Sequence, residues 1–186
     1  RKRLHDRFKM FLLLCFIYLS DKTIKVSSTC GDNLTFNLEA NKLTIIGNGI
    51  MYSYTNDQPS PWYDDRETIE EVILPSGLTA IGNYSFFECR NLKSIEFPGS
   101  LTSIGANSFS SCNSLQSIII PDSVTTLESR AFFNCTSLET VFIPGSISSI
   151  QSYAFTYCES LKNLTISEGV TSIESSAFSR CSGLEN

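Results

Sequence analysis

A repeat of 23 residues constrains the fold of this chain more than any other feature. Three residue types recur at this interval and form columns of phenylalanine (Phe86, Phe109, Phe132, Phe155, Phe178), cysteine (Cys89, Cys112, Cys135, Cys158, Cys181) and leucine (Leu92, Leu115, Leu138, Leu161, Leu184). Five of the seven cysteines share one phase, which excludes coincidence. A unit of this length cannot bury its apolar face alone, whereas stacked units bury a continuous one. The repeat therefore predicts a solenoid.

The unit from residue 98 to residue 120 predicts one short strand and one short helix. Ile118 and Ile120 alternate with outward positions, as a strand requires, and Pro121 then ends the strand. Phe109, Cys112 and Leu115 are spaced i, i+3 and i+6, which places them on one face of a short helical turn. The predicted fold class is an α/β repeat solenoid with one short strand and one short helix per unit.

These columns resemble the leucine-rich repeats of the BspA-like family, the treponemal type, whose repeat reads approximately LxxIxIPxxLxxIxxxAFxxC. The resemblance runs from Ile69 to Asn186 and includes the alanine before phenylalanine at Ala131, Ala154 and Ala177. It implies a leucine-rich repeat array over residues 69–186, with about five units and the last one truncated. Members of this family are secreted or cell-surface proteins, and those with known roles adhere to host matrix proteins.

Residues 30–68 are expected to form a small β-rich cap, and the segment from Cys30 to Arg66 resembles the N-terminal cap that often precedes such repeats. Apolar and polar residues alternate on both sides of residues 39–41, which predicts a β-hairpin. The single tryptophan, Trp62, is interpreted as cap core that covers the first repeat. Stacking of Trp62 against a ligand is the alternative.

Residues 1–20 combine a basic flank with an unbroken apolar run of ten residues, Met10 to Leu19. A helix of that length rises about 15 Å, half of the hydrocarbon core of a bilayer. A secretory signal peptide is therefore expected, with a short membrane anchor as the alternative, and residues 21–29 are expected to be a linker. The predicted location is secreted or at the cell surface.

Charge and histidine content exclude several functions. Without residues 1–20, nine Lys and Arg remain against 18 Asp and Glu, a net charge of -9. Such a surface repels phosphate and anionic lipid, so we expect neither nucleic acid binding nor membrane insertion of the mature domain. The only histidine, His5, lies in the expected signal peptide, which removes histidine nucleophiles and histidine metal sites.

The cysteine column is interpreted as a buried ladder of free thiols. Equivalent positions in adjacent coils lie about 4.8 Å apart with parallel side chains, a geometry that does not suit a disulfide. A linear ladder also cannot surround a metal ion, so no metal and no cofactor is expected. Cys15 is expected to leave with the signal peptide, and Cys30 has no obvious partner.

One acidic cluster raises the question of catalysis; it consists of Asp64, Asp65, Glu67, Glu70 and Glu71. Two carboxylates can serve glycoside hydrolysis, but nothing in the pattern predicts a cleft that would raise one pKa. The cluster is interpreted as a solvated rim beside the cap. No catalytic residue is assigned, and the chain is not expected to be an enzyme.

Solenoids bind partners through the outward residues of their strands. The predicted partner-binding residues are Ile73, Glu96, Ser117, Ile119, Thr140, Phe142 and Thr165. Ile119 and Phe142 are expected to be neighbours. Two large apolar side chains on a polar sheet suggest that another surface packs over them. A ligand, a second copy of the chain or edge packing could each supply that surface. Aromatic residues expected on the opposite, convex rim are Phe87, Phe133 and Tyr157.

The predicted function is a non-catalytic extracellular protein-binding module that recognises a host or matrix protein; an inert spacer in a longer surface protein is the alternative. Self-association through an uncapped C-terminal end is also considered. Four acceptor sequons, relevant only in a eukaryotic host, begin at Asn33, Asn83, Asn134 and Asn163. A glycan on Asn163 would block the strand face.

Overall fold

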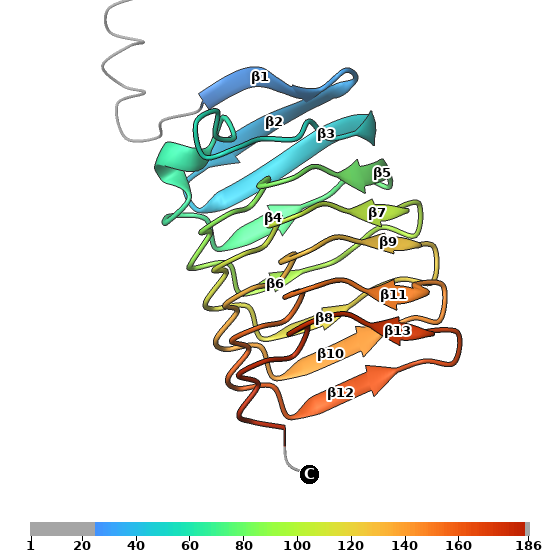
Figure 1. Ribbon diagram of the computed structural model, residues 1–186. Coiled ribbons are helices and arrows are strands. Elements are labelled where there is room, and N and C mark those ends of the chain that lie inside the picture. Colours follow the sequence, from blue (N-terminus) through green and yellow to red (C-terminus); the bar gives the residue numbers. More distant parts are fainter. Residues whose placement is uncertain (1–24, 185–186) are drawn as a thin grey trace, which may run out of the picture.

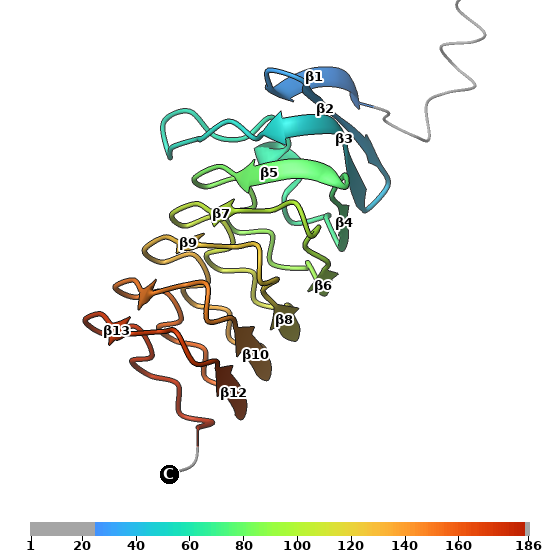
Figure 2. The same ribbon diagram turned by 90° about the vertical axis from the view of Figure 1, so that its right-hand side faces the viewer.

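The computed structural model describes residues 25–184, and for residues 25–28 it describes the backbone alone. Each repeat contributes one strand to each of two parallel rows (Figure 1). The first row contains β4 (Glu71–Ile73), β6 (Ser94–Ile95), β8 (Ser117–Ile119), β10 (Thr140–Ile143) and β12 (Asn163–Ile166). The second row contains β5 (Gly77–Ile81), β7 (Ser103–Ile104), β9 (Thr126–Leu127), β11 (Ser149–Ile150) and β13 (Ser172–Ile173). Figure 2 shows the second row in front and the first row along the right-hand edge.

Paired strands within a row are parallel and are displaced by one repeat, so Val141 lies opposite Ile118 on one side and Leu164 on the other. A turn joins the two rows in each repeat. There the N–H of Leu101 donates to the carbonyl oxygen of Pro98 at 3.0 Å, and the equivalent bonds follow the other prolines. Proline ends a strand because it has no N–H to donate to a neighbouring strand.

The prediction of one short helix per repeat is wrong. Apart from the 3-10 helix η1 (Tyr63–Asp65), residues 25–184 contain no helix. The segment in question is a run of turns, in which the N–H of Cys112 donates to the carbonyl of Phe109 at 3.2 Å. Asn107 and Ser111 have φ of 54° and 61°, and left-handed residues of this kind interrupt a right-handed helix. The spacing of three residues therefore reflects successive turns.

These turns hydrogen-bond to the next coil, which a helix would not do. The N–H of Phe109 donates to the carbonyl of Ala131 at 2.8 Å, and the N–H of Phe132 donates to the carbonyl of Ala154 at 2.9 Å. We call this third side of the solenoid the turn ladder; it comprises residues 84–88, 107–111, 130–134, 153–157 and 176–180. The turn ladder thus ties each coil to the next by backbone hydrogen bonds, whereas strand pairing is interrupted between β6 and β8 in the first row and between β9 and β11 in the second.

The phenylalanine column forms a continuous stack inside the solenoid. Ring centroids lie 5.1 Å apart for Phe86 and Phe109, 5.2 Å for Phe109 and Phe132, and 5.4 Å for Phe132 and Phe155. Phe178 stacks below Phe155 at 5.2 Å and is half-buried, whereas the other four are fully buried. Because Phe109, Phe132 and Phe155 each pack between two other phenylalanine rings, the stack links the coils through continuous apolar contact.

The cysteine column has a structural role besides filling space. The thiol of Cys112 donates to the carbonyl oxygen of Phe86 at 3.3 Å, and the thiol of Cys135 donates to that of Phe109 at 3.2 Å. The same bond recurs from Cys158 and Cys181. All six cysteines in the described part of the chain are free and buried. Each of these four thiols thus bonds the preceding coil, and the column is a ladder of free thiols.

The cap covers the first coil with an antiparallel sheet of β1 (Lys25–Gly31), β2 (Leu34–Glu39) and β3 (Lys42–Ile50). Glu39 pairs with Lys42, so the hairpin turns where the alternating pattern predicts it. The long strand β3 pairs with β4 through its first residues and with β5 through its last ones. Both rows of the array therefore begin on a single strand of the cap.

Candidate functional site: the strand face

The outward residues of the first row form one surface, which we call the strand face. Its two columns are Glu71, Ser94, Ser117, Thr140 and Asn163, and Ile73, Glu96, Ile119, Phe142 and Thr165. All ten side chains are exposed except that of Phe142, which is half-buried. The parallel register places Phe142 directly between Ile119 and Thr165. The structure thus brings the predicted residues together on one surface, and their role in binding stays a prediction.

Ile119 is the most exposed large apolar side chain of the described residues, with 71% of its surface accessible. Ile73 lies two coils away in the same column and is 39% exposed. The strands hold these side chains outward because Ile118 and Val72, next to them in sequence, point into the core. Phe142 is less exposed than the alternation predicts, although it occupies the expected rung, that is, the expected position of one coil within the column.

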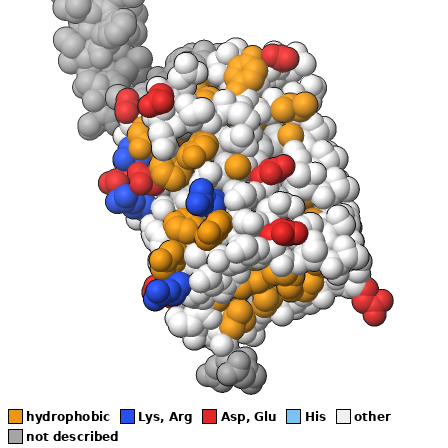
Figure 3. All heavy atoms as spheres, in the orientation of Figure 1, with side chains coloured by type: hydrophobic (Ala, Val, Ile, Leu, Met, Phe, Trp, Pro, Cys, Tyr) orange, Lys and Arg blue, Asp and Glu red, His pale blue; other side chains and the backbone are white. Residues whose placement is uncertain are grey.

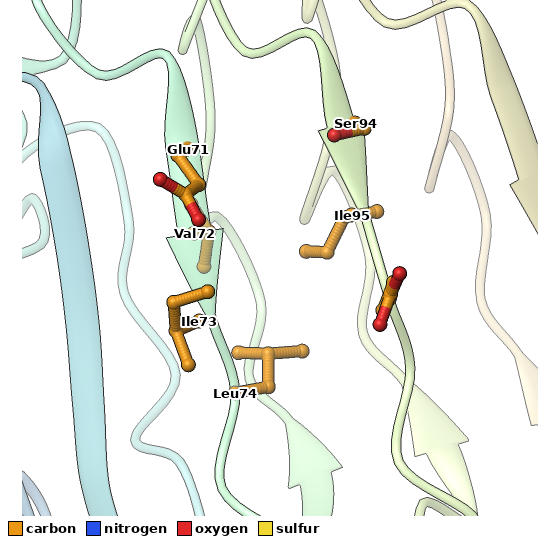
Figure 4. Close-up of a pocket in the computed structure, with 7 residues that line it drawn as sticks. Glu71, Val72, Ile73, Leu74, Ser94 and Ile95 are labelled. Carbon is orange, nitrogen blue, oxygen red and sulfur yellow. The ribbon is translucent and has the colours of Figure 1, made fainter.

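A shallow hollow of about 300 Å³ opens between β4 and β6. Seven residues line it: Glu71, Val72, Ile73, Leu74, Ser94, Ile95 and Glu96. Figure 4 shows the labelled side chains of β4 and Leu74 on one side of the hollow and those of β6 on the other. The lining combines four apolar side chains with the hydroxyl of Ser94 and the carboxylates of Glu71 and Glu96, so the hollow can receive an apolar side chain next to a basic one.

Charges on and beside the strand face are mostly paired. Glu71 accepts from the Lys42 ammonium of the cap at 3.1 Å, and Glu139 pairs with Lys162 at 3.6 Å. Glu96 differs, because it makes no ion pair with any residue in the described part of the chain. A carboxylate without an ion pair among residues 25–184 therefore lies on the coil between the exposed isoleucines of β4 and β8.

Two carboxylates of the acidic cluster beside the cap form ion pairs with the neighbouring coil. Glu70 pairs with Lys93, and Glu67 pairs with Arg90 at 3.5 Å. The hydrogen bond from Lys93 holds the pKa of Glu70 below its ordinary value, whereas a general acid needs a raised one. The sequence held a signal for these pairs, because each acid lies 23 residues before its base. This geometry fits the interpretation as a charged rim.

The turn ladder carries aromatic side chains and the two arginines Arg130 and Arg180. Figure 3 shows basic, acidic and hydrophobic side chains together along the left-hand edge of the molecule, the edge where Figure 1 shows the turns. Phe133 contacts Tyr157 edge-on at 5.5 Å, and the guanidinium of Arg130 lies 4.9 Å from the ring of Tyr153. Phe87 packs edge-on against Tyr84 at 5.3 Å. The three rim aromatics therefore lie away from the strand face, as predicted, and can serve as controls for it.

The sequons occupy different environments. Asn33 in the β1–β2 turn and Asn163 on the strand face are exposed, whereas Asn83, just before the turn ladder, and Asn134, within it, are half-buried. Asn83 accepts a hydrogen bond from the N–H of Ala106 at 2.8 Å. Asn163 donates to the hydroxyl of Thr140 at 3.4 Å, so it lies among the predicted binding residues.

The described residues offer neither a metal site nor a membrane-spanning helix. Residues 25–184 contain no group of three or more histidine, cysteine or acidic side chains arranged to hold a metal ion. No helix in that part of the chain has the length and hydrophobicity needed to cross a membrane. The expected signal peptide, residues 1–20, lies outside the described residues.

Comparison with known families assigns the array. The model of the BspA type leucine rich repeat region matches residues 60–185 in six copies. The chain belongs to this family. No curated protein matches the sequence.

Solved structures share the fold. A leucine-rich repeat protein from T. pallidum is 22% identical with a TM-score of 0.65, and the alignment covers 86% of this chain and 92% of that one. A leucine rich cell surface protein from Faecalibacterium prausnitzii is 30% identical with a TM-score of 0.61, and the alignment covers 83% of this chain and 46% of that one. The BspA-type array described here is thus a known architecture, and one of its relatives is named as a surface protein.

Proposed function

We propose that this chain is a non-catalytic, extracellular protein-binding module that recognises a host or matrix protein through its strand face. The exposed Ile119 beside Phe142 is the observation that carries the proposal. A large apolar side chain that is 71% exposed gains free energy when a partner covers it, and such residues at the centre of a polar face are typical of binding hot spots.

Two further observations support an extracellular role. One of the similar solved structures, at 30% identity, is named as a leucine rich cell surface protein. Residues 1–20 have the basic flank and short apolar run of a secretory signal. The competing function is an inert spacer in a longer surface protein, which needs no exposed apolar centre.

The test is surface plasmon resonance of the full chain over a panel of purified extracellular matrix proteins. We expect saturable binding to at least one of them and loss of that binding in Ile119→Asp. Phe133→Ser is the matched control on the turn ladder and should leave the affinity within about 0.5 kcal/mol of the parent. Circular dichroism must show that both variants fold.

Other results of the binding experiment would indicate a spacer function or a different binding site. A spacer gives no saturable binding on any surface of the panel. Loss of binding in Phe133→Ser with retention in Ile119→Asp moves the site to the turn ladder. Phe142→Asp is the less clean variant, because the ring is half-buried and its replacement also costs stability.

A further inference from the structure

The column Ile73, Glu96, Ile119 and Phe142 constrains the chemistry of any partner on the strand face. Along the solenoid axis these four side chains are apolar, acidic, apolar and apolar. The partner chemistry inferred from this order rests on the function proposed above. A partner that covers both isoleucines must also cover the carboxylate of Glu96 between them. Burying an unpaired carboxylate is costly, whereas pairing it with a cation offsets that cost. The partner therefore needs a Lys or Arg side chain at that rung.

The spacing of the rungs constrains the partner's backbone. Successive coils are tied by the backbone hydrogen bonds of the turn ladder, so the rungs lie about 4.8 Å apart even where β6 and β8 do not pair as strands. One face of an α-helix presents a side chain every three or four residues, which is a step of about 5.3 Å along its axis. One face of an extended strand presents a side chain every two residues, a step of about 6.7 Å. Over the three intervals of the column, a helix that uses positions i, i+4, i+7 and i+11 drifts by about 2 Å and a strand by about 6 Å. The helix therefore stays closer to register with the rungs.

We infer that the strand face binds an amphipathic α-helix that lies along the solenoid axis and presents one basic residue between apolar ones. The helix places its apolar residues at i, i+7 and i+11, over Ile73, Ile119 and Phe142, and its basic residue at i+4, over Glu96. The hollow of about 300 Å³ beside Ile73 and Leu74 receives the first apolar side chain (Figure 4). The charge of the strand face suits this partner, because of its two carboxylates Glu71 is paired with Lys42, whereas Glu96 has no cation among the described residues.

The test uses a fluorescent, alanine-rich helical peptide of about 18 residues, a length at which such helices begin to be stable in water. It carries leucine at i, i+7 and i+11 and arginine at i+4. A second peptide has the arginine and the leucine at i+7 exchanged, so that composition and charge are the same. Fluorescence anisotropy with the full chain should show saturable binding of the first peptide and binding about tenfold weaker for the second.

Two variants of the protein test whether the peptide recognises the charge at position 96 or only the net charge of the protein. Glu96→Lys should weaken binding of the first peptide about tenfold. Glu128→Lys makes the same charge change at an exposed residue that follows β9 in the second row, and it should leave the affinity within about twofold. Equal effects of the two substitutions, equal binding of the two peptides, or absence of binding would each overturn the inference.

Failure of the basic-helix inference can be distinguished from failure of the proposed protein-binding function. If a matrix protein binds in a way that depends on Ile119 but not on Glu96, the strand face is a binding site and the basic helix is the wrong occupant. If neither the matrix panel nor the peptide responds to Ile119→Asp, the strand face itself is excluded.

Discussion

Trp62 stacks on Phe86 with their ring centroids 5.7 Å apart and an interplanar angle of 20°, and its indole N–H donates to the carbonyl of Ser85 at 2.8 Å. The tryptophan is fully buried and also contacts Phe36 of β2 at 5.1 Å. It therefore continues the phenylalanine stack of the array into the cap. A solenoid end that would otherwise expose an aromatic ring to water is closed by a residue that is both stacked and hydrogen-bonded.

Replacement of Trp62 should separate the contribution of its stacking on Phe86 from that of its hydrogen bond to Ser85. Trp62→Phe keeps an aromatic ring on Phe86 but leaves the buried carbonyl of Ser85 without its donor, which should cost about 1 to 3 kcal/mol. Trp62→Ala also removes the stack and should cost about 3 to 5 kcal/mol. The measurement is urea denaturation followed by circular dichroism. Equal stability of the parent and Trp62→Ala would show that the tryptophan is not cap core and would favour its use in ligand stacking.

Phe132→Ala should open a cavity in the middle of the stack and cost about 3 to 5 kcal/mol, because the ring is fully buried between Phe109 and Phe155. Phe178→Ala is the matched control, since that half-buried ring has a stacking partner at Phe155 on one side. It should cost clearly less. Denaturant melts of the two variants that overlay would argue against a stack that couples the coils.

The stack and the inward side of each strand could be predicted from sequence, and the turn ladder could not. A spacing of three residues at Phe109 and Cys112 fits one face of a helix, and it equally fits two successive turns. What decides between them is the left-handed backbone at Asn107 and Ser111 together with hydrogen bonds to the next coil. Neither the apolar pattern nor the spacing encodes those bonds, so sequence periodicity favoured the wrong element.

The candidate site, too, could be predicted from the sequence only in part. Alternation along β8 and β10 correctly placed Ile119 and Phe142 in neighbouring rungs, because the pleat and the repeat length fix both face and register. The ion pairs of Glu70 and Glu67 with the next coil were missed, although the 23-residue offset already contained them. The isolation of Glu96 depends on which cations reach it in space, and only the structure gives that.

The buried thiols should make the fold sensitive to alkali. Burial raises the pKa of Cys135 from 9.0 to about 12. Between these values the unfolded chain has lost the thiol proton and the folded chain keeps it, so stability should be complete below pH 9 and should fall as the pH rises toward 12. Cys135→Ala removes one such group, and its urea midpoint should fall less steeply over that range than the parent's. An identical slope would contradict a buried, protonated thiol.

Alkylation provides the control for that interpretation. In denaturant without reductant, Cys112, Cys135 and Cys158 should all react fully with a thiol reagent, because each is free. In the native protein they should react slowly, since burial suppresses the thiolate that attacks the reagent. A peptide linking Cys112 to Cys135 in native material would replace the ladder of free thiols with a disulfide.

A glycan on the strand face should act as a steric block. Asn163 is exposed and lies one rung from Thr140, so expression in a eukaryotic secretory host should allow its sequon to be modified. Binding of the matrix protein or of the basic helical peptide should then be weakened, and Asn163→Gln should restore it. Asn33, in the β1–β2 turn away from the strand face, supplies the control, and a glycan there should leave binding unchanged. Full occupancy of Asn163, verified by mass spectrometry, together with undiminished binding would exclude the end of the strand face at β12 from the interface.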